Sequence, residues 1–369
     1  MAGTKVRPNH EAELQAEVES PEQVAPVVGN SAQASMAAQV RATRMAGREE
    51  PSTEEALEVL ETEAEYLDKD TTAFVKGDGD SRAIHSNDVA QGLTGDCWWM
   101  ASLAAIADTN FKLIEDAVED HGNGTYTVTL YDHERGEPTP KEYLVTELVP
   151  VLKKDIPDDK MDELGLIGKQ ATDAGDWAFA QPGDVSDGAL VEIWPLLFEK
   201  AMIQHLEQSR WTQQLRAENE DGFALMNVGQ MVMGLQSLSD ESGQMRSTTG
   251  RAELAEARGM RGPSELGWDE FSEMWSAGFA VTVGTWGGWD LHQHKDKLSP
   301  ETQEALQSFY EDGNLTSDHA YWISEVDLGS QMLTIKNPWG SHLEPLVMPW
   351  EDFQWAFHTI SVVPTGDRR

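Results

Sequence analysis

One thiol stands in a setting that suits nucleophilic chemistry. Cys97 is the only cysteine of the 369-residue chain. Gly92 and Gly95 leave the approach to it sterically open, and Asp96 can cap a helix that starts at the cysteine. The unpaired N–H groups and the dipole of a helix start favour the thiolate, which is the reactive form. A lone helical cysteine is more often a small buried side chain, so the nucleophile hypothesis needs a base.

A base and a residue to orient it are predicted at the two ends of a hairpin. Strands are predicted over 320–326 and 332–336, so His319 precedes the first strand and Asn337 follows the second. Both residues are equally distant from position 328, inside the turn, and in a regular hairpin their Cβ atoms would lie ~5 Å apart. An amide oxygen that accepts from one imidazole N–H would leave the other nitrogen for the thiol. An ordinary polar cross-strand pair is the alternative.

Two further residues could complete acyl-transfer chemistry. Gln91 precedes Cys97 across the glycine-containing turn, so its amide and the Cys97 backbone N–H could converge on one oxyanion. Trp339, in Asn337-Pro338-Trp339-Gly340, could cover the bond between the histidine and the asparagine. Taken alone, Gln91 is better interpreted as a surface glutamine, and Trp339 equally well as a core tryptophan.

Composition excludes several classes of function. The chain holds 27 Lys and Arg against 65 Asp and Glu, a formal net charge of −38. This charge argues against nucleic-acid binding, which needs a basic surface, and against docking on anionic membranes. No stretch approaches the ~20 apolar residues of a membrane span, and no secretory signal is visible at the start. A single cysteine excludes an intramolecular disulfide and suits a cytoplasmic location.

The elements that would position these residues divide the chain into three parts. Residues 1–70 hold one aromatic side chain and are expected to be a mostly disordered acidic extension with a short helix near 52–67. Whether this extension regulates the body is left open. Residues 71–215 are expected to form a first lobe that carries the cysteine, and 216–369 a second lobe that carries the histidine and asparagine.

Within the first lobe, the apolar run 97–107 predicts a buried helix. Segments 125–131 and 142–149 predict two strands. A second buried helix is predicted within 189–206, regular only from about Trp194 because Pro195 suits a first turn. Polar residues 213–221 are expected to separate the lobes, and a short strand is predicted at 280–284.

These motifs together resemble the catalytic core of the calpain family. The segment from Gln91 to Trp98 resembles its cysteine box, Asp318-His319-Ala320-Tyr321 its histidine box, and Asn337-Pro338-Trp339-Gly340 its asparagine box. Segments 192–201 and 350–357 resemble the family's Glu-aromatic-Trp…Leu-Glu-Lys-Ala helix and its closing segment. The likeness spans about residues 72–362 in the family's order, with departures at Leu93-Thr94 and Trp99-Met100.

The resemblance implies an α+β, papain-like fold of two lobes that acts as a cysteine endopeptidase on protein or peptide substrates. It implies Cys97 as the nucleophile and His319 as the base, oriented by Asn337. The oxyanion donor would be Gln91, and the shield Trp339.

The resemblance also implies calcium, with Asp88 and Glu192 as acidic ligands of a site in the first lobe. Only residues 341–349 separate the asparagine box from the closing segment, and Glu344 is their sole acid, so the family's second site has too few ligands. We therefore expect at most one family-type calcium site and no organic cofactor. Two alternatives stay open, namely an acyl transferase with the same triad and a catalytically silent binding or scaffold protein.

Overall fold

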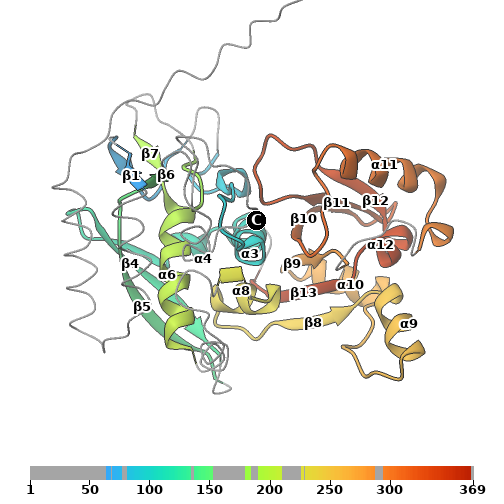
Figure 1. Cartoon of the computed structure of the whole chain (residues 1–369). Coiled ribbons are helices and arrows are strands. Elements are labelled where there is room, and N and C mark those ends of the chain that lie inside the picture. The colour runs from blue at the N-terminus through green and yellow to red at the C-terminus, as the bar shows by residue number, and fades with distance from the viewer. Residues whose placement is uncertain are drawn as a thin grey trace, which may run out of the picture.

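The structure is a computed structural model of the whole chain. It describes residues 64–67, 69–76, 81–133, 137–152, 179–183, 190–209, 226–227, 229–286 and 294–366. The described part is an α+β protein whose elements form two groups, one on each side of Figure 1. The first group contains β1 (Ala64–Tyr66), β2 (Thr71–Thr72), the 3₁₀ turn η1 (Ser86–Asp88), α3 (Cys97–Asn110), α4 (Lys112–Glu115), β3 (Val118–Asp120), β4 (Thr125–Asp132), β5 (Thr139–Thr146), β6 (Pro150–Leu152), β7 (Val191–Glu192) and α6 (Trp194–Gln208).

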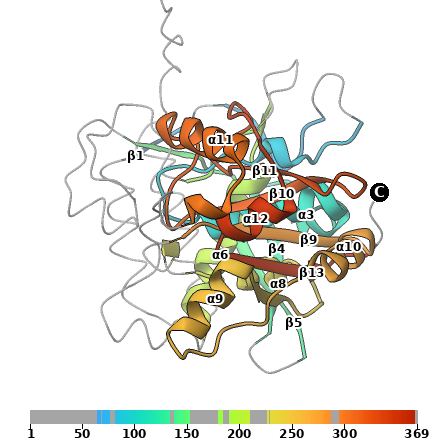
Figure 2. The same ribbon diagram turned by 90° about the vertical axis from the view of Figure 1, so that its right-hand side faces the viewer.

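The second group is built on a six-stranded antiparallel sheet of order β12-β11-β10-β9-β13-β8. Helices α9 to α12 lie on the side of this sheet away from α6 (Figures 1 and 2). Its elements are α8 (Met231–Ser237), β8 (Gln244–Ser247), α9 (Thr249–Ala257), α10 (Trp268–Ser276), β9 (Phe279–Gly284), the 3₁₀ turn η3 (Lys295–Lys297), α11 (Pro300–Glu311), β10 (Ala320–Asp327), β11 (Met332–Lys336), β12 (Leu346–Pro349), α12 (Trp350–Ala356) and β13 (Thr359–Pro364).

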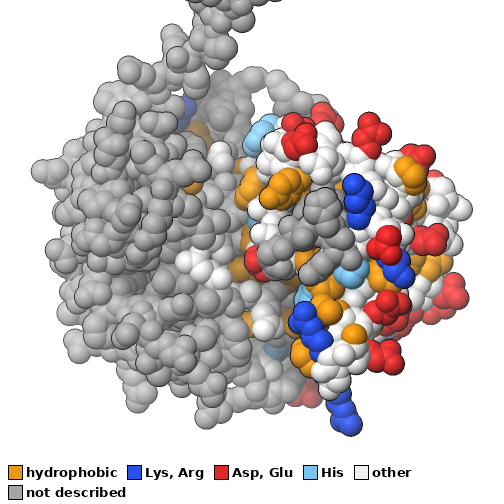
Figure 3. Space-filling model, turned by 45° about the vertical axis from the view of Figure 1, so that its right-hand side comes forward, with side chains coloured by type: hydrophobic (Ala, Val, Ile, Leu, Met, Phe, Trp, Pro, Cys, Tyr) orange, Lys and Arg blue, Asp and Glu red, His pale blue; other side chains and the backbone are white. Residues whose placement is uncertain are grey.

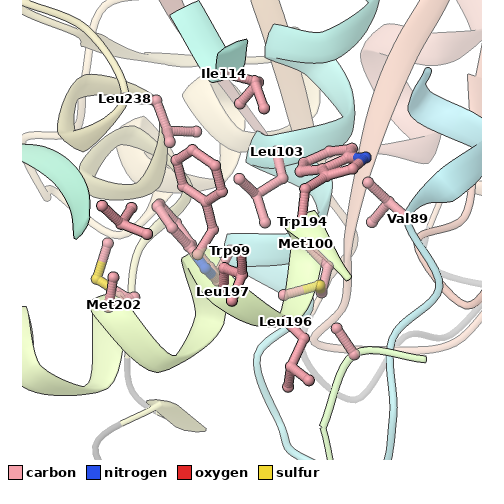
Figure 4. Close-up of a cluster of buried hydrophobic side chains, with 14 of the residues drawn as sticks. Val89, Trp99, Met100, Leu103, Ile114, Trp194, Leu196, Leu197, Met202 and Leu238 are labelled. Atoms are coloured by element: carbon pink, nitrogen blue, oxygen red, sulfur yellow. The ribbon is translucent and has the colours of Figure 1, made fainter. Parts of the chain in front are cut away.

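Helix α3 forms the centre of the molecule. It packs against α6, α8, β9 and β10, and Figure 1 shows it between the two groups. Nearly all of its side chains are buried, which explains why the sequence is apolar on every face of the helix. Trp99, Met100 and Leu103 of α3 meet Trp194 and Leu197 of α6 in the cluster drawn in Figure 4.

The six-stranded sheet joins the two groups because its two faces enter different cores. Successive side chains of a strand point to opposite faces. In β10, Ala320 and Trp322 belong to the same core cluster as α3 and α6, whereas Tyr321 and Ile323 enter a second cluster under α10 to α12. Trp322 Nε1 also donates to Asp108 Oδ2 of α3 over 2.9 Å. One face of the second group is therefore part of the first group's core.

The N-terminal boundary differs from the sequence-based expectation. Ala64–Tyr66, the end of the helix expected over 52–67, is a strand that pairs antiparallel with Pro150–Leu152. The ring of Tyr66 is only 2% exposed, so tertiary pairing and the burial of an aromatic side chain outweigh the local helix pattern. The body begins before residue 71, and residues 1–63, including the rest of the expected helix, lie outside the described residues.

The other predicted elements are found with shifted ends. The helix that starts at Cys97 extends to Asn110, and α6 starts at Trp194 with its proline in the first turn. The strand expected at 142–149 lies at Thr139–Thr146. The polar boundary at 213–221 lies outside the described residues. In the described part of the chain, no helix is long and apolar enough to cross a membrane. Figure 3 shows Asp and Glu side chains spread over the second group, as expected for a solvated acidic surface.

Candidate active site

The candidate nucleophile lies at the first position of α3. The carbonyl oxygen of Asp96 accepts the first helical hydrogen bonds, from the N–H groups of Trp99 and Met100. Asp96 thus occupies the N-cap position, but its side chain makes no capping bond and is completely buried. The expectation of a side-chain cap is wrong, because the carboxyl group points into the protein instead of toward the helix N–H groups.

The pKa of the Cys97 thiol is raised, although the residue as a whole is only half-buried. Burial raises its pKa to about 11, and the neighbouring Asp96 raises it further, while the backbone N–H groups of Ala320 and Trp98 oppose the shift. A helix start favours a thiolate, as expected from the sequence, but here desolvation of the charge outweighs that effect. A nucleophilic role would therefore require the thiol to lose its proton to a nearby base.

His319 and Asn337 make the hydrogen bond that the hairpin predicts. His319 Nε2 and Asn337 Oδ1 are 3.0 Å apart, and both side chains are buried. Asn337 Nδ2 donates to the Asn314 carbonyl oxygen over 2.8 Å, which fixes the amide with its oxygen toward the histidine. Nε2 is therefore the protonated nitrogen, and Nδ1 is the atom that can accept a proton. Burial lowers the pKa of His319 to about 4, and the bond to Asn337 only partly opposes this shift.

The strand register that produces this contact differs from the predicted one. Trp322 pairs with Lys336 and Ile323 with Ile335, so Asn337 lies opposite position 321 and not opposite His319. The register shifts between Ile323 and Glu325, where a bulge adds one residue to β10. His319 and Asn337 still point to the same face because the difference is two residues, and their side chains meet diagonally.

Trp339 covers this pair. Its ring centroid lies 4.8 Å from that of His319, with an interplanar angle of 49°. The Trp339 backbone N–H donates to Asn337 Oδ1 over 3.1 Å, so one amide oxygen holds both the imidazole and the covering residue. Tyr321 contacts the other side of the imidazole edge-on, at 4.8 Å between ring centroids. Trp339 thus lies against the imidazole that the sequence expects it to cover.

The cysteine lies beside the residue that follows the histidine at the start of β10. The Ala320 backbone N–H hydrogen-bonds the Cys97 thiol, and Ala320 directly follows His319. The charge of a Cys97 thiolate would also raise the pKa of Tyr321. The start of α3 and the start of β10 therefore lie side by side, although 97 and 319 are far apart in the chain. Thr285 fixes the histidine backbone, since its N–H donates to the His319 carbonyl oxygen and its hydroxyl accepts from the His319 N–H.

Gln91 lies in the turn that leads into α3. Its side chain is 3% exposed, so it is not a surface glutamine. Nε2 donates to the Thr94 carbonyl oxygen over 2.7 Å, and the amide also contacts the Asp96 carboxyl. The amide of Gln91 carries two N–H donors, and the Thr94 carbonyl oxygen occupies one of them. The second N–H is available to an oxyanion only when it is not bonded to the Asp96 carboxyl. Oε1 finds no donor among the described residues.

Asp88 and Glu192, the candidate calcium ligands, lie on either side of Gly183. A Cβ added to Gly183 would be 2.7 Å from Glu192 Oε2 and 3.3 Å from Asp88 Cβ. Asp88 Oδ2 accepts from the N–H of His85 and from Trp194 Nε1, and Glu192 Oε1 accepts from the N–H of Val75. In the part of the chain that the structure describes, no group of three or more His, Cys, Asp or Glu side chains is arranged to hold a metal. Backbone oxygens and water would have to supply most of the 6–8 oxygens that calcium takes.

Sequence reasoning missed three contributors to this site. They are Asn314, which orients the Asn337 amide, Thr285, which holds the His319 backbone, and Glu199, whose carboxyl contacts that of Asp96. Asn314 and Thr285 have no distinguishing sequence pattern. Glu199 follows the apolar run 196–198 of α6, and a charged residue directly after such a run was a usable signal. No protein-family model matches the chain.

Proposed function

We propose that the chain is a cysteine endopeptidase with a papain-like arrangement of two lobes, similar to the calpain catalytic core. The observation that carries the proposal is the 3.0 Å bond between His319 Nε2 and Asn337 Oδ1, with the Cys97 thiol held at the N–H of the residue after His319. A nucleophile beside a base that a third residue orients is the arrangement that acyl-transfer enzymes share. We place the enzyme in the cytoplasm, where a lone thiol stays reduced.

The first half of the reaction forms a thioester. His319 Nδ1 takes the thiol proton while Sγ attacks the carbonyl carbon of the substrate peptide bond. The developing oxyanion accepts hydrogen bonds from the backbone N–H of Cys97 and from the second amide N–H of Gln91. When the C–N bond breaks, the imidazolium returns its proton to the departing amine. Asn337 keeps the imidazole oriented throughout, and Trp339 shields their hydrogen bond from water.

The second half hydrolyses the thioester. Water gives a proton to His319 and its oxygen attacks the acyl carbon; the C–S bond then breaks and the sulfur recovers the proton. Protein or unfolded peptide chains are the substrate class that this chemistry serves. If calcium binds, Asp88 and Glu192 would hold it, and its role there is to neutralise two buried carboxylates and fix the turn before Gln91.

Two alternative functions use the same residues. An acyl transferase would pass the thioester to an amine instead of water, and a silent scaffold protein would only bind. A silent protein needs no oriented imidazole, and here Asn314, Asn337 and Thr285 all serve to orient one. This arrangement favours an active enzyme.

Product analysis tests the proposal. Wild type and Cys97→Ala are incubated with an unfolded protein, with and without calcium, and the products are identified by mass spectrometry. The protease proposal expects new peptide termini with wild type and none with Cys97→Ala. New isopeptide bonds would identify the acyl transferase, and turnover by Cys97→Ala would refute the nucleophile.

A further inference from the structure

A buried pair of carboxyl groups lies directly behind the candidate nucleophile. Asp96, at the N-cap of α3, contacts Glu199 on α6, and neither side chain is exposed to solvent. Glu199 Oε2 accepts from the Ala180 N–H over 2.6 Å. Among the described residues, no well-aligned hydrogen bond reaches Glu199 Oε1 or either oxygen of Asp96, although the Gln91 amide lies close to the Asp96 carboxyl. Two ionised carboxylates in such a place would repel each other without compensation.

A proton between the two acids removes this conflict. It supplies the donor that the facing oxygens lack, as in other buried carboxyl pairs. The surrounding charges agree. Within the described part of the chain, Lys200 is the cation that acts on Glu199, and its amine donates to the carbonyl oxygens of Thr146 and Leu148. The other titratable group that faces the pair is the Cys97 thiol. Burial accordingly raises the pKa of both carboxyls.

We propose that Asp96 and Glu199 share a proton at neutral pH and that this proton positions Gln91 and Cys97 for catalysis. This inference rests on the proposed function, because it concerns the same site. While the pair holds the shared proton, Asp96 attracts the second amide hydrogen of Gln91 less strongly, so that this hydrogen can reach the oxyanion. The pair with its shared proton carries one negative charge, and loss of the proton adds a second, which draws the Gln91 amide more strongly toward Asp96 and opposes the formation of a thiolate at Cys97.

The pair therefore acts as positioning residues that make the site sensitive to alkaline pH. Asp96→Asn places a covalently bound N–H donor where the shared proton lies, so it keeps a partner for Glu199 without a titrating acid. The variant should lose the alkaline fall in kcat and keep its KM. We expect the ratio of kcat at pH 9 to kcat at pH 6 to rise at least about fivefold relative to wild type. Glu304→Gln is the matched control, because Glu304 is exposed on α11 and its change also removes one negative charge.

Two measurements need no enzymatic activity, so they separate this inference from the proposed function. Infrared spectra of the full chain at neutral pH should show a protonated carboxyl band that disappears in both Asp96→Asn and Glu199→Gln. The free energy of unfolding of wild type should fall relative to Asp96→Asn as pH rises from about 4 toward neutral, since only the folded wild type retains the proton there. An unchanged band in both variants, or parallel stability curves, would overturn the shared proton. An unchanged kcat profile in Asp96→Asn would overturn its role in positioning.

Discussion

The backbone N–H of Gln91 donates to the carbonyl oxygen of Pro338 over 2.8 Å. This bond connects the turn before the nucleophile with the segment that carries the orienting asparagine. Gln181 Nε2 strengthens the same turn by donating to the Gln91 carbonyl oxygen over 3.0 Å. The turn that carries Gln91 is thus linked through its backbone to the segment that carries Asn337, and small changes in other side chains should leave this frame intact.

Cys97→Ala should abolish peptide cleavage, because no other thiol exists in the chain to replace it. A thiol alkylator should modify one site and remove activity in proportion to modification. Peptide mapping and residual-rate assays on the same samples check this. Turnover by a fully alkylated protein would contradict the mechanism.

His319→Ala should reduce kcat by about 10²–10⁴-fold, because it removes the proton acceptor. Asn337→Ala should cost less, since Thr285 still holds the histidine backbone and Trp339 still contacts its ring. Steady-state kinetics of both variants beside wild type give the comparison. Equal losses, or a larger loss for Asn337→Ala, would count against the assigned roles.

Alkylation of Cys97 by a neutral reagent should accelerate by about tenfold per pH unit between pH 5 and pH 7. The reason is that burial raises the pKa of the thiol to about 11 and lowers that of His319 to about 4, so both groups are uncharged in this range. Stopped-time alkylation followed by mass spectrometry measures the rate. A plateau over this range would show instead that a thiolate–imidazolium pair is already formed.

Two truncations should differ sharply in stability. Removal of residues 1–63 leaves every described contact in place and should preserve cooperative unfolding. Removal of 1–70 also deletes β1 and the buried ring of Tyr66, which should cost about 3 kcal/mol or more. Denaturant titrations of both proteins check the difference, with Tyr66→Ala in the full chain as control. Equal stability of the two truncations would show that β1 contributes nothing to the fold.

Calcium should bind weakly and without cooperativity, with a Hill coefficient of about 1 if activity responds at all. Asp88→Asn and Glu192→Gln should each abolish the binding seen by calorimetry, since they keep the hydrogen-bond acceptors for Trp194 and Val75 but remove the charge. A steep calcium threshold with two bound ions would contradict the expectation of a single site.

Short sequence patterns predicted the elements that are determined by residues close together in the chain. The buried helix at Cys97, the start of α6 near Trp194 and the hairpin around 328 follow from apolar runs, proline and turn residues. The contact between His319 and Asn337 was predicted for the right side chains with the wrong register. Asp327 pairs with Met332, so the turn is centred between residues 329 and 330 and not at 328, and the bulge in β10 offsets only one residue of this difference.

Features that depend on distant partners were not predictable in this way. Tyr66 lies in a pattern typical of a helix, yet it forms a strand because Pro150 pairs with it. The raised pKa of Cys97 follows from desolvation of the half-buried thiol by the surrounding fold, which the helix-start pattern does not contain. The contact between Glu199 and Asp96 forms only in the folded chain, when α6 packs beside the start of α3, so it could not be predicted from the sequence around Glu199.

The shared core of α3 and β10 has a consequence for the timing of catalysis. Ala320 and Trp322 pack in the same apolar cluster as α3, and Trp322 is bonded to Asp108 on that helix. Hinge motion between the halves would have to expose this apolar surface to water, which is unfavourable. The halves should therefore stay joined between turnovers, and an enzyme assembled in this way should begin its first turnover without a lag.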